Sequence, residues 1–188
     1  MVRNTARREE LAALATDYAL DHGLIGLSLR PLAAAIDTSD RMLLYHFAGK
    51  DDLVATILRI SNDRSVEAVR ARPRSRTVRT AVLDLWEVST SGESDRCHRV
   101  YVEAAALGLL GREPYVSVVR EANKRWVEAL ADHLVAAGCP RVRAGRAVAL
   151  LDATFMGLQL DLPVDPHKPH RKRVVGDLAD AIAEIAGG

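Results

Sequence analysis

Apolar residues recur every three or four positions along most of this chain, and glycine or proline separates one such segment from the next. This spacing places the apolar residues on one face of an α-helix. Strands would instead show alternation of apolar and polar residues, which is absent. Aromatic residues make up only 4% of the sequence and alanine is abundant, which also favours helix. We therefore expect an all-α fold of about nine helices.

The expected helices follow from this periodicity and from the breaking residues. On the first of them the apolar face would comprise Leu11, Leu14, Ala15, Tyr18 and Ala19. The expected ranges are about 4–22, 29–36, 39–45, 50–71, 77–90, 95–110, 115–137, 141–160 and 171–186, with residues 91–94 as a turn.

Residues 28–50 predict two short helices joined by a tight turn at Asp37. Ser28 is a candidate N-cap for the first helix, and Thr38 or Ser39 for the second. The residues expected to pack the two helices together are Leu32, Ala33, Ile36, Leu43 and Phe47. Those expected to point outward or sideways are Asp40, Arg41, Met42, Leu44 and Tyr45. A pair of this kind is typical of the helix-turn-helix, whose second helix enters the major groove of DNA.

The same segment resembles the TetR family of transcriptional regulators. The residues in register with the family pattern are Ser28, Ala33, Ser39, Leu43, His46, Phe47 and Lys50. The resemblance covers about residues 5–58, and the remainder of the chain matches only in the number and length of its helices. The sequence departs from the pattern at the turn, where Asp37 replaces a glycine and Thr38 a valine. It departs again at Leu44, where the family often has tyrosine.

The resemblance implies a set of DNA contacts. Phosphate contacts are expected from Ser28, Thr38, His46 and Lys50, with Ser39 leading the recognition helix. Base contacts are expected from Arg30, Asp40, Arg41, Met42 and Tyr45. Lys50 would place an ammonium at a helix start, Arg41 or Arg30 can bind guanine bidentately, and Met42 can pack on a thymine methyl group. Asp40 either accepts from a cytosine amino group or stabilises its own helix N-terminus.

The resemblance further implies a division of function at about residue 50. Residues 1–50 would form the helix-turn-helix DNA-binding domain, and residues 51–188 would bind an unspecified small-molecule effector and form a homodimer. The last two expected helices each have an apolar face, which either forms a four-helix dimer interface with a second subunit or packs within one subunit. On helix 141–160 this face comprises Ala147, Val148, Leu151, Thr154, Phe155 and Leu158. On helix 171–186 it comprises Val174, Leu178, Ala181, Ile182 and Ile185. Candidate ligand-binding residues are Trp86, Tyr101, Trp126, Phe155, Met156 and Gln159, which are alternatively ordinary core.

The sequence therefore predicts an effector-responsive regulator, a repressor by the habit of the family, that binds a palindromic operator as a dimer. Its formal net charge of +1 means that any attraction to DNA must be local. We expect a cytoplasmic protein without signal peptide or membrane span. The two cysteines, Cys97 and Cys139, form no motif that would suggest a disulfide framework. No cofactor or metal is expected.

Three alternatives remain open at this level. An enzyme would use polar residues on apolar backgrounds, namely Cys97, His98, Glu103, His133 and Asp152, but no catalytic motif accompanies them. The enzyme is therefore not expected. A metal sensor would use Cys97 with His98, or His167 with His170, the latter two in a segment rich in proline and basic residues. A helical protein-interaction module would require neither Arg41 nor Lys50.

Overall fold

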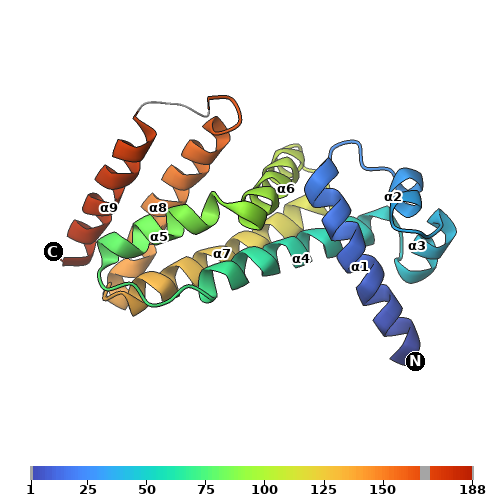
Figure 1. Cartoon of the computed structure of the whole chain (residues 1–188), viewed down its shortest axis with the longest axis horizontal. Helices are drawn as coiled ribbons and strands as arrows, with labels where there is room; N and C mark the ends of the chain where they lie inside the picture. The colour runs from blue at the N-terminus through green and yellow to red at the C-terminus, as the bar shows by residue number, and fades with distance from the viewer. Residues whose placement is uncertain (1, 166–169, 188) are drawn as a thin grey trace. The chain divides into compact units, whose positions relative to one another are not determined.

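The computed structural model describes residues 2–165 and 170–187, and in these residues the chain forms nine α-helices and no strand (Figure 1). The all-α prediction is confirmed. The helices are α1 (Val2–His22), α2 (Leu29–Ala35), α3 (Asp40–His46), α4 (Lys50–Arg70), α5 (Val78–Ser89), α6 (Gly92–Leu109), α7 (Tyr115–Ala136), α8 (Arg141–Asp161) and α9 (Arg171–Gly187).

The helices form two compact units. The N-terminal unit comprises Met1–Ser65 and Asp95–Lys124, and the C-terminal unit comprises Val66–Ser94 and Arg125–Gly188. The N-terminal unit thus contains α1, α2 and α3 together with most of α4 and α6 and the start of α7. These two units are defined by how the residues pack together. The predicted boundary at residue 50, between DNA binding and effector binding, does not coincide with them and stays a prediction.

A continuous apolar core fills the N-terminal unit. Its fully buried members include Leu11, Leu32, Leu43, Leu53 and Ile57, which come from the first four helices. On α1 the buried face differs from the predicted one, because Leu14 is 38% exposed. The buried positions there are Leu11, Ala12, Ala15, Thr16, Ala19 and Leu20. The apolar stripe is therefore wider than the face that packs, and the sequence shows only the stripe.

In the C-terminal unit α9 packs against both α5 and α8 (Figure 1). Its core includes Val82 and Leu85 from α5, Val148 and Leu151 from α8, and Ile182 from α9. Most of the α8 face that the sequence suggested for dimerisation is therefore buried inside the chain. The opposite face of α8 remains exposed.

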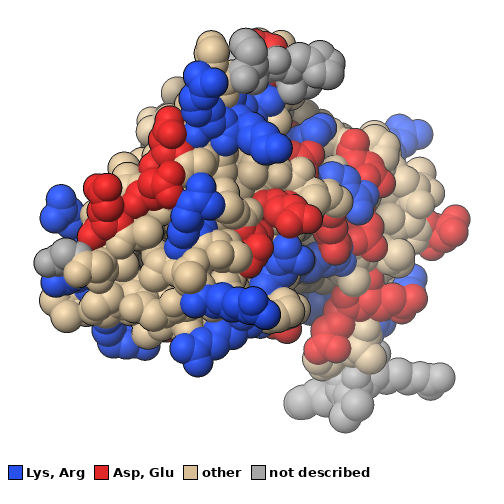
Figure 2. Space-filling model, turned by 60° about the vertical axis from the view of Figure 1, so that its left-hand side comes forward, with Lys and Arg blue, Asp and Glu red and all other residues tan. Residues whose placement is uncertain are grey.

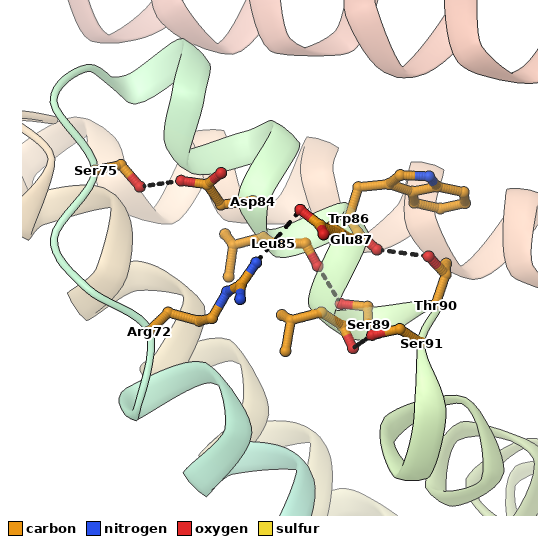
Figure 3. A network of polar contacts seen from close by, with 10 residues as sticks. Arg72, Ser75, Asp84, Leu85, Trp86, Glu87, Ser89, Thr90 and Ser91 are labelled. Carbon is orange, nitrogen blue, oxygen red and sulfur yellow. Dashed lines mark hydrogen bonds and ion pairs between the residues drawn. The ribbon is translucent and has the colours of Figure 1, made fainter.

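Polar contacts attach the segment before α5 to that helix, and a further contact caps its C-terminal end (Figure 3). The Ser75 hydroxyl donates to Asp84 at 2.6 Å, and Arg72 pairs with Glu87 at 3.5 Å. At the C-terminal end the Thr90 hydroxyl donates to the carbonyl of Trp86 at 2.8 Å. The same carbonyl also accepts from the Thr90 amide at 3.1 Å, so Thr90 closes this end of α5 with both its amide and its hydroxyl.

Helix α6 begins at Gly92, three residues before the predicted start at 95. The predicted turn at 91–94 is therefore too long. Gly92 takes a positive φ of 54°, a conformation open to glycine, and only Thr90 and Ser91 separate α5 from α6. Glu93 and Asp95 then lie in the first turn of α6, where negative side chains favour the helix N-terminus.

The surface is of mixed charge. Figure 2 brings forward the side on which α8 and α9 lie in Figure 1, and basic and acidic side chains are interspersed there with uncharged surface. Within the described part of the chain, no helix combines the length and apolar character needed to cross a lipid bilayer.

Candidate nucleic-acid interface

The turn between α2 and α3 is closed by its backbone. Asp37 has a φ of 51°, and is the one non-glycine residue with positive φ in the described segments. This conformation lets the Thr38 amide donate to the carbonyl of Ala33 at 2.9 Å, while the Ile36 amide donates to Leu32 at 3.1 Å. Aspartate tolerates the left-handed region better than most residues. The predicted turn at Asp37 is confirmed.

Helix α3 is capped by Ser39, which decides between the two candidates. The Ser39 hydroxyl accepts a hydrogen bond from the Met42 amide at 3.2 Å, whereas Thr38 lies before the cap. The Asp40 carboxylate accepts from the Arg41 amide at 2.9 Å. Asp40 therefore contacts its own helix N-terminus here, and its contact with a base stays a prediction.

The inward and outward faces of the α2–α3 pair agree with the sequence analysis. Figure 1 shows the two short helices next to each other beside α1. All five residues predicted to pack them together are buried in one core: Leu32, Ala33, Ile36, Leu43 and Phe47. The five predicted to point away are exposed, with Met42 at 40%, Leu44 at 52% and Tyr45 at 69%, together with Asp40 and Arg41.

The candidate phosphate contacts lie at helix ends. Lys50 is the exposed first residue of α4 and follows Gly49, whose carbonyl accepts from the Leu53 amide at 3.2 Å. Ser28 occupies the predicted N-cap position of α2, but its hydroxyl makes no capping hydrogen bond. Its backbone is extended, and only its carbonyl, which accepts from the Leu32 amide at 3.3 Å, takes part in the helix.

The remaining candidates differ in exposure. Arg30 is exposed on α2, whereas Thr38 and His46 are half-buried. The His46 ring lies edge-on to the Tyr45 ring, with 5.1 Å between centroids. Two aromatic rings in contact restrict each other, so the exposed Tyr45 side chain has support from within its own helix. None of the ten DNA contacts is tested by the protein alone, and they stay predictions.

Sequence analysis missed Arg8, which joins α1 to both ends of the α3–α4 corner. Its Nε donates to the carbonyl of His46 at 3.1 Å, and its Nη2 donates to the Asp52 carboxylate at 3.3 Å. The guanidinium also lies 4.8 Å from the centroid of the Phe47 ring. Nothing local distinguishes Arg8 from its neighbour Arg7, because these contacts reach 38 and 44 residues along the chain.

Glu103 of α6, which the sequence analysis named only for the enzyme alternative, holds the connection between α1 and α2. Its carboxylate accepts from the amides of Leu24 and Ile25, at 2.7 and 2.6 Å. Gly23 makes this approach possible, since its φ is 80° and a β-carbon there would lie 2.6 Å from the Glu103 carboxylate. On the same helix Arg96 pairs with Asp21 at 2.8 Å. Helix α6 is therefore fixed to the end of α1 at two points.

The candidate effector residues lie in both units. In the C-terminal unit the Trp86 and Phe155 rings meet edge to face at 5.1 Å, and Gln159 donates to the carbonyl of Ser89 at 3.0 Å. Met156 is half-buried on the same helix as Phe155. Tyr101 belongs to the N-terminal unit, where its ring stacks on that of His98. The predicted ligand-binding role of these residues stays untested.

Asp152 of α8 is a half-buried carboxylate in the C-terminal unit. It accepts a hydrogen bond from the indole N–H of Trp126 at 3.0 Å. Burial raises the pKa of Asp152 above its usual value, and the hydrogen bond from Trp126 opposes this to a smaller extent. No basic side chain among the described residues pairs with it. When ionised, the carboxylate is thus a negative charge that the described residues leave uncompensated.

The residues of the alternative hypotheses are dispersed. Cys97, His98 and Glu103 belong to the N-terminal unit, whereas His133 and Asp152 belong to the other. Burial lowers the pKa of both His98 and His133. Within the described segments no group of three or more histidine, cysteine or acidic residues is arranged to hold a metal ion. His170 is exposed, and His167 lies outside the described residues.

Comparison with known proteins identifies the fold. No protein-family model matches the chain, and neither does any curated protein. Among solved structures, a transcriptional regulator from Rhodococcus sp. Rha1 is 24% identical over 95% of both chains, with a TM-score of 0.73. A protein described as a TetR-family regulator, from Rhodococcus sp., is 19% identical over 97% of this chain and 99% of its own, with a TM-score of 0.72.

A third solved structure is that of the multidrug binding protein EbrR in complex with imidazole. It is 25% identical over 94% of each chain, with a TM-score of 0.67. EbrR is also known in complexes with proflavin and with ethidium. Since the matches span nearly the full length of each chain, they establish the fold and confirm at that level the resemblance seen in about residues 5–58.

The different capping of α2 and α3 generates a prediction. Ser39→Ala removes the hydrogen bond to the Met42 amide and should lower the free energy of unfolding by about 1 kcal/mol. Ser28→Ala removes a hydroxyl without such a bond and should change it by less than about 0.5 kcal/mol. Urea unfolding followed by circular dichroism measures both. Equal losses in the two variants would contradict this assignment of the cap.

Proposed function

On the premise that the chain has the fold of the TetR-family transcriptional regulators, we propose that it is a transcriptional regulator that binds operator DNA. The observation that carries the proposal is the α2–α3 pair. Its core-facing residues are buried, and the outer face of α3 is exposed and rich in side chains able to contact bases. A helix with one face packed on the core and the opposite face exposed to solvent is suited to insertion into the major groove.

The side chains on the exposed face of α3 are chemically suited to recognise DNA bases. Arg41 is exposed and can bind the O6 and N7 atoms of guanine with both arms of its guanidinium. Met42, at 40% exposure, offers an apolar contact for a thymine methyl group. Tyr45 adds a large ring with a hydroxyl at its edge, supported by His46. Arg30 would reach the same groove from α2.

Phosphate binding would fix the helix in the groove. Lys50 places an ammonium at the start of α4, where backbone N–H groups also favour an anion. The Ser28 hydroxyl is not used in capping α2 and is therefore free to donate to a phosphate. Thr38, Ser39 and His46 would contribute from the turn and the end of α3. The modest basic charge of this face predicts weak nonspecific binding and leaves affinity to the specific contacts.

The exposed face of α8 supports dimerisation. One side of this helix is buried in the chain. The other presents Val142, Ala149, Ala153, Gly157 and Leu160 to solvent, and the exposed Arg146 interrupts this apolar row. A contiguous row of exposed apolar residues often marks an interaction surface. Small residues allow a second helix to approach closely, and a two-fold pair of such faces is self-complementary. We assign this surface, the α8 stripe, to a second copy of the chain.

A two-fold dimer accounts for the expected operator. Two α3 helices related by two-fold symmetry would read half-sites about 34 Å apart, or a multiple of one DNA turn. The operator would then be an inverted repeat. We propose that binding represses transcription and that the protein acts in the cytoplasm, in keeping with the resemblance to the TetR family.

The effector would bind in the C-terminal domain at residues 51–188. The aromatic contact between Trp86 and Phe155, with Met156 and Gln159 nearby on α8, supplies apolar surface and a polar tip. Trp126 belongs to the same unit, whereas Tyr101 belongs to the N-terminal unit and remains a separate candidate. Asp152 adds a half-buried negative charge that no basic side chain in the described part of the chain neutralises. An aromatic ring beside a carboxylate attracts a cation, so the proposed effector is an aromatic organic cation.

The first test is selection of bound sites from random duplex DNA. The wild-type protein should enrich an inverted repeat. An Arg41→Ala, Lys50→Ala double variant should lose at least about tenfold in affinity for it, because a bidentate guanine contact is worth about 1–3 kcal/mol. The variant removes only exposed side chains and should remain folded.

Two outcomes would contradict the proposed function. Absence of any enriched site, with a folded dimer, would favour a protein-interaction module instead. Equal affinity for a single half-site and for the inverted repeat would contradict binding of the repeat by a dimer. As a control, Ala153→Arg places a charge in the α8 stripe and should give a monomer with weak affinity for the repeat, whereas Ala136→Arg, at an exposed alanine of α7, should not.

The proposed effector class generates a separate prediction for Asp152→Asn. Asparagine keeps an acceptor for the Trp126 N–H and removes the charge. The pKa of Asp152 is higher in the folded protein than in the unfolded chain. The ionised carboxylate therefore lowers the free energy of unfolding at pH values above the folded-state pKa, and has no such effect at pH values below the unfolded-state pKa. The variant should therefore be more stable than wild type near pH 7, with a difference that shrinks as the pH falls toward 4.

The same variant should bind ethidium at least about tenfold more weakly, since it lacks the counter-charge. Urea unfolding between pH 4 and 8 and fluorescence titration with ethidium measure the two effects. A lower stability at pH 7 would contradict the uncompensated charge. Unchanged ethidium affinity, or no binding by the wild type, would contradict the proposed effector class.

A further inference from the structure

Arg8 is the residue of α1 through which three separate elements meet. Its Nε donates to the carbonyl of His46, the last residue of α3, and its Nη2 donates to Asp52 in the first turn of α4. The guanidinium also lies over the Phe47 ring, at 4.8 Å from its centroid. All four residues belong to the N-terminal unit. One side chain therefore connects α1, the end of α3 and the start of α4.

The carbonyl of His46 is a natural acceptor for a cation. Helix α3 has only seven residues, and the last carbonyls of any helix lack partners within it. The partial negative charge at this end favours a guanidinium, whose N–H groups satisfy the acceptor directly. Arg8 thus binds the end of α3 opposite to the one that Ser39 caps.

Asp52 connects the same contact to the α3–α4 corner. Its carboxylate oxygen accepts from Arg8 at 3.3 Å and from the Ala48 amide at 3.0 Å. The corner contains Gly49 and leads directly into Lys50, the proposed phosphate contact. Arg8 therefore constrains both α3, which would read bases, and the helix start that would bind a phosphate.

We propose that Arg8 is a positioning residue for base reading: it sets the angle of α3 and its register with Lys50 without contacting the operator. This inference rests on the proposed function. Hydrogen bonds to base edges require accurate placement of the helix, whereas nonspecific attraction to phosphates depends mainly on charge. Loss of Arg8 should therefore reduce specific binding much more than nonspecific binding.

Arg7 provides a matched control. It is the neighbouring residue, has the same charge, and its side chain is 40% exposed, as is that of Arg8. Its ion pair, at 2.7 Å, is with Glu10 on the same helix. Arg7→Ala thus removes one positive charge from the same turn of α1 and leaves the contacts to α3 and α4 in place.

The experiment compares Arg8→Ala, Arg8→Lys and Arg7→Ala. The dissociation constants for the selected operator and for a scrambled duplex are measured over a range of salt concentrations. Arg8→Ala should weaken operator binding by at least about tenfold relative to Arg7→Ala, with similar affinities of the two for the scrambled duplex. Lysine should not rescue, because it restores the charge without the two-armed geometry.

Two results would overturn the inference. One is an operator affinity of Arg8→Ala equal to that of Arg7→Ala. The other is an equal loss on both duplexes with a salt slope smaller by about one, which indicates a direct phosphate contact. Failure of the wild type itself to prefer the operator would instead overturn the proposed function, and the two failures are thereby distinguished.

A second measurement needs no DNA and covers the case in which Arg8→Ala folds poorly. Asp52→Asn retains an acceptor for the Ala48 amide and weakens only the pair with Arg8. In both Arg8→Ala and Asp52→Asn, the amides of Leu43 and Phe47 should exchange with deuterium faster than in Arg7→Ala, since the end of α3 is less constrained. Exchange as slow as in Arg7→Ala would contradict the positioning role.

Discussion

Burial of Leu43 and Phe47 is the interaction on which the N-terminal unit depends. Helix α3 is only seven residues long, so its own hydrogen bonds do not suffice to keep it folded. Leu43 is fully buried and Phe47 is 2% exposed, in a core shared with α1, α2 and α4. This packing holds α3 on one side and leaves the other side uncovered. Exposure of Tyr45 and Leu44 follows from it, since they occupy the opposite face.

Polar contacts then fix what the apolar core leaves adjustable. Apolar packing is not directional, whereas hydrogen bonds are, so the angle of α3 depends on Ser39 at one end and Arg8 at the other. Glu103 performs a similar task for the connection between α1 and α2. Because Glu103 lies on α6, a displacement of that helix would act on the end of α1 directly.

The sequence was sufficient for features that depend on local chemistry. The periodicity of apolar residues predicted the helices, and Asp37 predicted the turn that its positive φ confirms. Ser39 was one of two candidate caps. Ser28 occupies the N-cap position of α2 as predicted, but its hydroxyl makes no capping hydrogen bond, because that bond needs a side-chain rotamer that the sequence does not specify.

Contacts between residues far apart in the sequence could not be predicted from local sequence patterns. Arg8 and Glu103 make contacts that span from 38 to 79 residues, and neither belongs to a motif. On α8 the periodicity identified an apolar face correctly but left open whether a second subunit or the chain itself covers it, because the spacing of apolar residues does not specify what packs against them. Packing against α5 and α9 settles that question within the chain.

The central claim is that two copies of α3 occupy the major groove of one inverted repeat. Methylation protection at guanine N7, which lies in the major groove, tests it most directly. We predict two protected patches on one face of the operator, with centres about 10 base pairs apart or at a multiple of that spacing. A single protected patch, or binding that leaves every guanine N7 of the operator accessible, would contradict the account.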